Sequence, residues 1–215
     1  IYLDSNLIIK IMIKRVEKIT DKITLYNCDC MEYMKNIPDK YFDLCITDPP
    51  YGIDACNMTM GSGTNKKWSK GKKWDNNIPP KEYFDELFRV SKNQIVWGGN
   101  YFNLPPKRGW IFWDKGIDGD CSFADGELAW TSFDVVLRKA NIRYKGFLGM
   151  DKERIHPTQK PVKLYEWLLK NYAKPTDKIL DTHFGSCSIG IACHNFGCSL
   201  DACELDEEYF DKALE

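Results

Sequence analysis

The sequence FDLCITDPPYG, residues 42–52, contains an apolar strand that runs directly into an acid, two prolines and an aromatic residue. Leu44 and Ile46 belong to a short apolar run that is typical of a strand covered on both faces in a parallel sheet. Pro49 and Pro50 end this strand, because each fixes φ and lacks an N–H donor. The stretch therefore predicts an α/β sheet with a rigid turn at the carboxyl end of one strand.

The same turn has the chemistry of a recognition site. Its proline carbonyls have no ladder partners, and they lie beside the Asp48 carboxylate and the Tyr51 ring. Rigid hydrogen-bond acceptors next to a flat aromatic face fit a planar ring that carries an amino group. An ordinary turn with a strand-capping acid is the alternative, and the rest of the chain has to decide between the two.

Length and composition favour one domain over residues 1–215, long enough to bury a sizeable core. The formal net charge of -1 gives no global attraction to nucleic acid, so such binding needs a local patch. The 9 cysteines lack the pattern of a disulfide scaffold, which favours a reducing, cytoplasmic setting. No apolar stretch reaches the length of a membrane span.

The first residues, 1–11, are apolar but lack the basic region and the cleavage site of a signal peptide. Met12 followed by Ile13, Lys14 and Arg15 resembles a natural start. We expect residues 1–11 to be an upstream extension or a short edge strand.

Strand-like and helix-like segments alternate along the chain. We expect strands at 23–26, 42–47, 94–97, 110–113, 127–130, 178–181 and 198–203, and helices at 31–37, 80–90, 162–172, from 189 onward and at 207–214. Apolar residues at helical spacing in 80–90 are Tyr83, Phe84, Leu87 and Val90, and Leu164, Trp167 and Leu168 are expected to point inward from 162–172. This rhythm predicts a mostly parallel sheet with helices on both faces.

Residues 53–79 interrupt the rhythm with glycines and small polar residues, which predicts a mobile loop. Lysines alternate in it with Trp68 and Trp74. The candidate DNA-binding residues are Lys66, Lys67, Lys70, Lys72 and Lys73. Because the loop follows the Asp-Pro-Pro-Tyr turn, we expect it to contact phosphates and close over DNA. A solvated charged loop is the alternative.

A second basic segment lies at 137–154 and shows no regular period. Its cations are Arg138, Lys139, Arg143, Lys145 and Arg154. A solvated face explains it most simply, and a segment that contacts phosphates or reads the target is the sharper option. Residues 97–155 are therefore expected to include DNA-contacting segments.

Near the C-terminus, strand 178–181 runs into a small-residue turn, a helix and a strand that ends at Glu204. This is the arrangement of a nucleoside-binding βαβ unit. Gly185 and Ser186 let the backbone approach a ligand closely. Glu204 follows Asp181 by about twenty residues, where a carboxylate accepts hydrogen bonds from ribose hydroxyls.

A cluster of thiols and one imidazole in the same region does not predict a metal site. Its members are Cys187, Cys193, His194, Cys198 and Cys203. They lack the paired spacing of structural zinc ligands, and Cys193 and His194 fall within a predicted helix and Cys203 within a predicted strand.

The order of four motifs is the most specific signal in the chain: DPPY at 48–51, HPTQKP at 156–161, DxxxGS at 181–186 and ExD at 204–206. This order resembles the beta-ordered amino-group methyltransferases of the N6/N4 DNA methylase family, which methylate adenine N6 or cytosine N4. The resemblance covers residues from about 22 to 214. It implies a Rossmann-like methyltransferase fold with a circularly permuted sheet, in which the catalytic half precedes the cofactor half.

The resemblance also implies S-adenosylmethionine as cofactor. Glu204 would hold its ribose, Asp29 would face the amino group of its adenine, and residues 181–186 would lie by its methionine part. Residues 156–160 would help to hold the methionine carboxylate. The full set of implied cofactor residues is Asp29, His156, Thr158, Lys160, Asp181, Phe184, Gly185, Ser186 and Glu204.

Two positions depart from the family pattern. The family usually has Phe where His183 stands and Gly where Cys187 stands. We expect at most a reduced affinity for the cofactor.

The catalytic residues implied by the resemblance are Asp48, Pro49, Pro50 and Tyr51. Hydrogen bonds from the target amine to Asp48 and to the Pro49 carbonyl would direct its lone pair and stabilise positive charge on the nitrogen. Tyr51 would stack on a base flipped out of the duplex. The chain lacks the Pro-Cys dipeptide of enzymes that form a thiol adduct, which fits direct transfer.

Asp rather than Ser before Pro-Pro-Tyr favours adenine N6 as the target in double-stranded DNA. A cytosine-N4 enzyme and a catalytically impaired DNA- or cofactor-binding remnant are the alternatives. A protein-glutamine or RNA methyltransferase is a further class, although such enzymes usually carry Asn first and the opposite motif order. Related beta-ordered enzymes are often homodimers, and both a restriction-modification system and a phage fit the sequence.

Overall fold

The computed structural model describes residues 13–54, 75–117, 124–144, 155–156 and 158–215. Its strands are β1 (Arg15–Lys18), β2 (Ile23–Asn27), β3 (Phe42–Thr47), β4 (Ser91–Trp97), β5 (Trp110–Asp114), β6 (Gly126–Thr131), β7 (Arg138–Asn141), β8 (Lys178–Asp181) and β9 (Ser199–Glu204). Its helices are α2 (Cys30–Met34), α3 (Lys81–Val90), α4 (Val162–Tyr172), α5 (Ser188–Phe196) and α6 (Glu207–Leu214), with a 3-10 turn η2 (Gly99–Tyr101).

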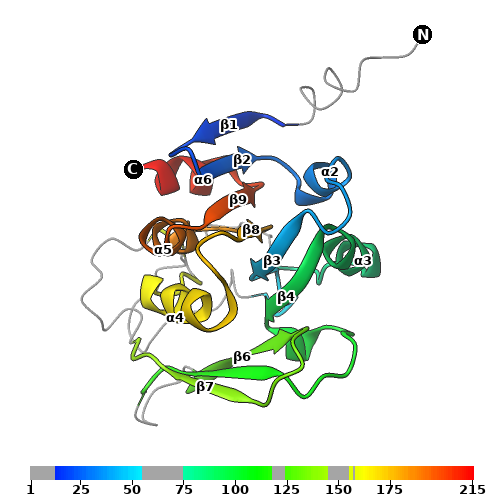
Figure 1. The fold of residues 1–215 in the computed structure, drawn as a ribbon, viewed down its shortest axis with the longest axis vertical. Helices are drawn as coiled ribbons and strands as arrows, with labels where there is room; N and C mark the ends of the chain where they lie inside the picture. Colours follow the sequence, from blue (N-terminus) through cyan, green and yellow to red (C-terminus); the bar gives the residue numbers. More distant parts are fainter. Residues whose placement is uncertain (1–12, 55–74, 118–123, 145–154, 157) are drawn as a thin grey trace.

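All these strands form one sheet in the order β1-β2-β9-β8-β3-β4-β6-β5-β7 (Figure 1). The central strands β2, β9, β8, β3 and β4 are parallel, whereas β6 runs antiparallel to both β4 and β5. The C-terminal strands β8 and β9 lie between β2 and β3, so both ends of the chain build the centre of the sheet. The predicted mostly parallel, permuted α/β sheet is confirmed.

Helices cover both faces of the sheet (Figure 1). On one face, α4, α5 and α6 bury Leu164, Ile189 and Phe210 against the sheet. On the other face, α2 and α3 bury Met34 and Leu87. Strand β3, at the centre of the sheet, is buried at Leu44, Cys45 and Ile46 in succession, as expected for a strand covered on both faces.

Helices α3 and α4 follow from their apolar spacing. Every predicted inward residue of α3 is buried, and the helix begins directly after Pro80, as expected for proline at a helix start. The bounds of α4 match the prediction. Its buried residues include Tyr165 and Leu169, however, while Trp167 is only partly buried at the rim of the core.

Among the elements that differ from the sequence-based expectation are β7, β1 and α2. Strand β7 forms within the second basic segment, where only Ala140 is buried, so no alternation could reveal it. Strand β1 is an edge strand that was not predicted. It follows residues 1–11, which lie outside the described residues. Helix α2 ends at Met34, because Asn36 and Ile37 close tighter turns onto Tyr33 and Met34 ahead of Pro38.

Within the described ranges, no helix has both the length and the apolar character that crossing a membrane requires.

Candidate active site

The carboxyl ends of β2, β3, β8 and β9 meet at one edge of the sheet. Connections leave in opposite directions from β8, which continues to β9, and from β3, which continues to β4. Ligands bind in the crevice at such a switch point. A cavity of about 460 Å³ lies there, which is the size of a small-molecule site.

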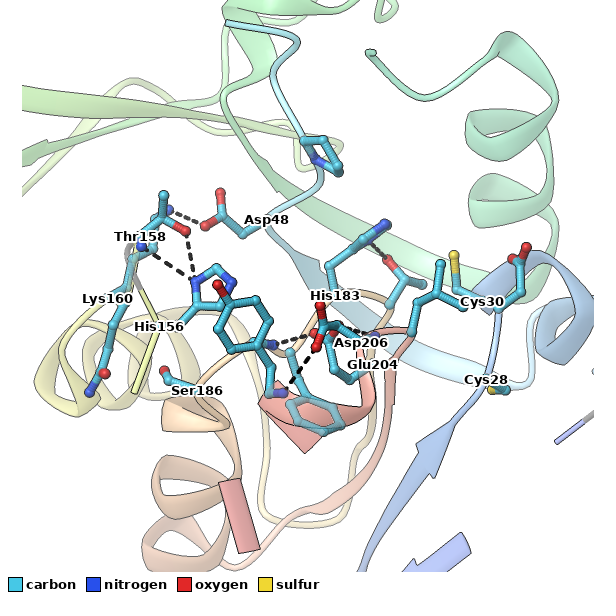
Figure 2. A pocket seen from close by; sticks show the side chains of 18 of the residues that line it. Cys28, Cys30, Asp48, His156, Thr158, Lys160, His183, Ser186, Glu204 and Asp206 are labelled. Carbon is cyan, nitrogen blue, oxygen red and sulfur yellow. Dashed lines mark hydrogen bonds and ion pairs between the residues drawn. The ribbon is translucent and has the colours of Figure 1, made fainter. Parts of the chain in front are cut away.

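Most of the predicted site residues line this cavity (Figure 2). They are Asp29, Asp48, Pro50, His156, Thr158, Lys160, Phe184, Gly185, Ser186 and Glu204. Asp181 does not line it, but is buried and accepts a hydrogen bond from the backbone N–H of His183 at 3.0 Å. Pro49 and Tyr51 do not line it, although they belong to the same turn as Asp48.

Glu204 forms the floor of one end of the cavity. Its Oε2 accepts from the N–H of Gly185 at 3.0 Å, and its Oε1 accepts from the N–H of Asp206 at 2.8 Å. Burial nevertheless raises the pKa of Glu204 to about 7. Gly185 has φ of +52°, and a β-carbon there would approach the His156 ring to 3.3 Å, so glycine brings the turn and His156 together.

Asp29 lies at the end of β2, where it caps helix α2. Its Oδ1 accepts from the N–H of Met31 at 2.8 Å. This cap fixes the carboxylate at the rim of the cavity, next to Cys28 and Cys30.

The Asp-Pro-Pro-Tyr turn is held by an acid that the sequence pattern did not single out. The carboxylate of Asp75 accepts from the N–H of Tyr51 at 2.6 Å and from the N–H of Gly52 at 3.0 Å. Asp75 is only 1% exposed and lies within the segment predicted as a mobile loop. The backbones of Asp54 and Asp75 are hydrogen-bonded, so this end of the segment is anchored on the turn.

The Asp48 carboxylate has one partner for each oxygen. The hydroxyl of Tyr51 donates to Oδ1 at 2.5 Å, and the ammonium of Lys160 donates to Oδ2 at 2.5 Å. Lys160 also forms an ion pair with Glu127 at 3.0 Å. Lys160 was expected beside the methionine part of a cofactor. In the structure its ammonium group contacts the Asp48 carboxylate.

Hydroxyl groups and an imidazole form a buried cluster behind Asp48. The hydroxyls of Thr47 and Thr182 lie 2.6 Å apart, and Nδ1 of His183 lies 2.9 Å from the Thr182 hydroxyl. Tyr83 completes the cluster at 2.7 Å from Thr182. Burial lowers the pKa of His183 to about 4, so its imidazole is neutral at pH 7. His183 thus makes polar contacts where a phenylalanine could make none.

The predicted DNA-contacting residues are only partly described. Lys66, Lys67, Lys70, Lys72 and Lys73 lie outside the described residues, as do positions 145–154 of the second basic segment. The described cations of that segment, Arg138, Lys139 and Arg143, are exposed on and after β7.

Sequence reasoning missed further cavity residues and Glu127. Those lining the cavity include Tyr165, Thr182, Leu205, Asp206 and Tyr209. For Glu127 a signal was present, because an acid in an otherwise apolar strand must find a partner when it is buried. For Asp75 there was none, since it lies in a segment with the composition of a loop.

Two of the described thiols, Cys28 and Cys30, line the cavity. Each cysteine within the described ranges is a free thiol. Those same ranges contain no group of three or more His, Cys, Asp or Glu side chains able to hold a metal ion.

Comparison with known proteins places the chain among DNA-modifying enzymes. Residues 96–215 match the model of a DNA methylase family. The type II methyltransferase M.HinfI of Haemophilus influenzae is 25% identical, over 92% of this chain and 69% of its own length. M.HpaI of Haemophilus parainfluenzae is 23% identical, over 87% of this chain and 71% of its own length.

Solved structures share the fold. The M1.HpyAVI–SAM complex superimposes with a TM-score of 0.60 at 19% identity, covering 89% of this chain and 98% of that one. The cytosine-N4-specific PvuII DNA methyltransferase gives a TM-score of 0.58 at 16% identity, covering 91% and 86%.

Proposed function

The chain belongs to the DNA methylase family, and on that premise we propose that it transfers a methyl group from S-adenosylmethionine to the exocyclic N6 of adenine in double-stranded DNA. One observation carries the proposal. The Asp48 carboxylate of the Asp-Pro-Pro-Tyr turn and the Glu204 carboxylate line the same cavity, so an amine acceptor and a nucleoside-binding acid face one space.

The cavity fits the cofactor by size and by its donor and acceptor groups. Its volume of about 460 Å³ lies within the range of small-molecule sites. Glu204 is positioned by two backbone N–H groups, which aim its remaining lone pairs at ribose hydroxyls. Asp29 would accept from the adenine amino group, Leu205 and Phe184 offer apolar surface, and His156 and Ser186 would lie by the methionine end.

Bound S-adenosylmethionine supplies a methyl group that is already activated on a sulfonium. The protein therefore has to orient the target amine in line with it. Asp48 and the carbonyl of Pro49 accept hydrogen bonds from this amine and direct its lone pair toward the cavity. Asp48 also stabilises the positive charge that develops on the nitrogen, and Tyr51 supplies the aromatic surface for a flipped base.

Adenine is the proposed base because Asp stands first in the Asp-Pro-Pro-Tyr motif. Cytosine N4 is the second candidate, since an enzyme with that specificity has the same fold. Both amines are exocyclic and planar, so the same acceptors serve either base. Identification of the methylated nucleoside distinguishes the two targets.

Positive side chains provide the attraction to DNA that the net charge of -1 does not. We assign this role to the lysines between residues 66 and 73, together with the exposed Arg138 and Lys139. Each phosphate contact contributes about -0.9 to the slope of log K against log salt concentration. Replacing the lysines with glutamine should therefore weaken DNA binding and flatten that slope, without changing the methylated base.

The decisive experiment incubates the protein with methyl-labelled S-adenosylmethionine and unmethylated genomic DNA, which offers every short recognition sequence. The DNA is then digested to nucleosides and separated. Label in N6-methyladenine supports the proposal, and label in N4-methylcytosine corrects the base. Cofactor binding without transfer to any nucleic acid would overturn the proposal. It would favour the alternative of a catalytically impaired protein that only binds DNA or cofactor.

The matched variant is Asp48→Ala. We expect a loss of transfer of at least about 100-fold, the scale on which a single oriented hydrogen-bond partner acts in a transition state. Cofactor affinity, measured by calorimetry, should stay within a few-fold of the wild-type value, because Glu204 and Asp29 are unchanged. A parallel loss of cofactor binding would show that the cavity had collapsed.

A further inference from the structure

We propose that Glu127 and Lys160 are positioning residues that together aim the Asp48 carboxylate and set its charge for accepting the target amine. The proposal rests on the proposed function, because it concerns the same carboxylate. It adds a residue from β6, a strand that none of the recognised motifs includes.

The geometry joins segments that are far apart in the chain. Lys160 precedes α4, and its ammonium lies 2.5 Å from Oδ2 of Asp48 and 3.0 Å from Oε2 of Glu127. The other oxygen of Glu127 pairs with Lys115 of the β5 region at 2.7 Å. The ions therefore alternate in sign along the row Asp48, Lys160, Glu127, Lys115.

Burial makes this alternation necessary. The side chain of Lys160 is only 3% exposed, and an unpaired charge at that depth would be strongly destabilising. Asp48 alone would neutralise Lys160 and would be neutralised by it. Glu127 is a second anion that compensates Lys160, and Lys115 in turn compensates Glu127.

The direction of each pKa agrees with this division of charge. Burial lowers the pKa of Lys160, but Asp48 and Glu127 together raise it above its ordinary value. Burial raises the pKa of Glu127, but Lys160 and Lys115 lower it to about 2. Both groups are therefore charged at pH 7.

Opposing effects act on the pKa of the Asp48 carboxyl. Burial raises its pKa above the ordinary value, Lys160 opposes that shift, and Glu127 adds to it. The other ionisable groups that act on Asp48 or feel its charge are Tyr51, Tyr165 and Asp181. Lys160 and Glu127 thus act on the Asp48 carboxyl in opposite directions.

The arrangement leaves Asp48 able to accept a further hydrogen bond. A carboxylate has about four lone-pair sites, and Tyr51 and Lys160 use one on each oxygen. A protonated Asp48 would present an O–H toward the cavity, and it would be a weaker acceptor for the target amine. The reaction therefore requires an ionised Asp48. Stability alone does not require these ion pairs, because well-packed apolar side chains in their place would stabilise the fold at least as well.

The test compares Lys160→Met with Glu127→Gln in the dependence of kcat/KM on pH. Without its cation, Asp48 should gain protons more readily, so the acidic limb moves to higher pH. Without its neighbouring anion, Asp48 should lose protons more readily, so the limb of Glu127→Gln moves to lower pH. Lys160→Arg keeps the charge and should return the limb toward its wild-type position.

Lys92→Met is the matched control. Lys92 pairs with Asp43 at 2.6 Å near the start of β3, whereas Asp48 directly follows the end of this strand. This variant loses an ion pair that is more exposed than the Lys160–Asp48 pair, and it should leave the acidic limb in place. Thermal unfolding of each variant separates loss of stability from the change in the limb.

A second measurement does not depend on activity. Carbon-13 labelling of aspartate carboxyls, with Asp48→Asn to assign the signal, follows the Asp48 titration in the wild-type protein and in each folded variant. Opposite shifts of this titration support the proposal. Identical midpoints in all of them, or equal losses of activity with an unmoved limb, overturn it and reduce the pairs to a structural role.

Failure of the proposed function gives a different result. In that case no methyl transfer is detected with the wild-type protein, whereas the Asp48 titration still moves in opposite directions in the two variants.

Discussion

The ring of Tyr51 lies against the backbone of Gly98 so closely that a β-carbon on Gly98 would come within 2.2 Å of ring atom Cε1. Gly98 follows β4 with φ of +67°, a conformation that side chains disfavour in any case. Tyr101 stacks on the Tyr51 ring, with 5.0 Å between the ring centroids. The hydrogen bond from the Tyr51 hydroxyl to Asp48 therefore depends on the absence of a side chain at residue 98.

Gly98→Ala should displace the Tyr51 ring and reduce methyl transfer by at least about 100-fold, because Asp48 loses a partner and the base loses its stacking surface. Cofactor affinity should change little, since Gly98 does not line the cavity. Initial rates of label transfer and calorimetric titration with the cofactor measure the two effects separately.

Gly197→Ala is the control for backbone strain. Gly197 ends α5 with φ of +86°, and a β-carbon there would meet nothing within 4 Å. This variant should lose about 1 kcal/mol of stability and keep its activity. An equal loss of activity in both alanine variants would attribute the effect of Gly98→Ala to general destabilisation.

Elements with strong local signals were predicted to the residue. Helix α4 has apolar residues at helical spacing, and α6 begins after Asp206, whose carboxylate accepts from the N–H of Glu208. Strand β8 is a buried apolar run bounded by polar residues. Strand β7 was missed because an exposed edge strand has no alternation to read.

The location of the site followed from topology, and its contacts did not. Asp29 and Asp48 follow parallel strands and Glu204 ends one, and the carboxyl ends of such strands share one edge. The pairing of Lys160 with Glu127 joins distant segments through side chains. No local pattern encodes such a contact, because it exists only once the sheet has brought the two segments together.

Cys187 and Gly190 form a steric pair at the start of α5. Cys187 has φ of 56°, which explains a preference for glycine at that position, and a β-carbon on Gly190 would lie 2.6 Å from the Cys187 sulfur. Gly190→Ala should therefore destabilise the wild-type protein by about 1–2 kcal/mol through overpacking.

In a Cys187→Gly background the same Gly190→Ala change should be neutral or stabilising, because alanine favours the helix by about 1 kcal/mol over glycine. Urea unfolding of the four proteins in this cycle measures the coupling. Equal effects of Gly190→Ala in both backgrounds would show that the sulfur does not limit this helix.

Asp181 should make the protein less stable as pH rises. Burial raises its pKa from 3.8 to about 8, so between these values the folded state binds a proton that the unfolded state has lost. The free energy of unfolding should then fall by up to about 1.4 kcal/mol per pH unit between about pH 4 and pH 8. This contribution is fully present below about pH 4 and is lost above about pH 8.

Asp181→Asn removes this contribution while its side-chain oxygen can still accept from the N–H of His183. The variant should match the wild-type protein near pH 4 and exceed it in stability near pH 9. Denaturant unfolding at several pH values measures the difference between the two proteins, in which the other titrating groups largely cancel. Parallel curves would mean that Asp181 is already ionised in the folded state.

Glu204 should make cofactor binding depend on pH near neutrality. Burial raises its pKa to about 7, although the N–H groups of Gly185 and Asp206 act to lower it. On the proposed function, an ionised Glu204 would accept from both ribose hydroxyls, whereas a protonated one has lost acceptor capacity. The dissociation constant for the cofactor should therefore rise as pH falls below about 7, by up to about tenfold per unit for a single linked proton.

The Glu204→Gln variant distinguishes this carboxyl from other titrating groups. It cannot ionise, so its affinity should be weak at every pH and should lack the wild-type slope. Because binding favours the ionised form, the wild-type protein should also release a proton on binding below about pH 7, and calorimetry in buffers of different ionisation enthalpy detects that proton. A wild-type affinity that stays constant between about pH 5.5 and pH 8 would mean that Glu204 is already ionised throughout this range, or that it does not contact the ribose.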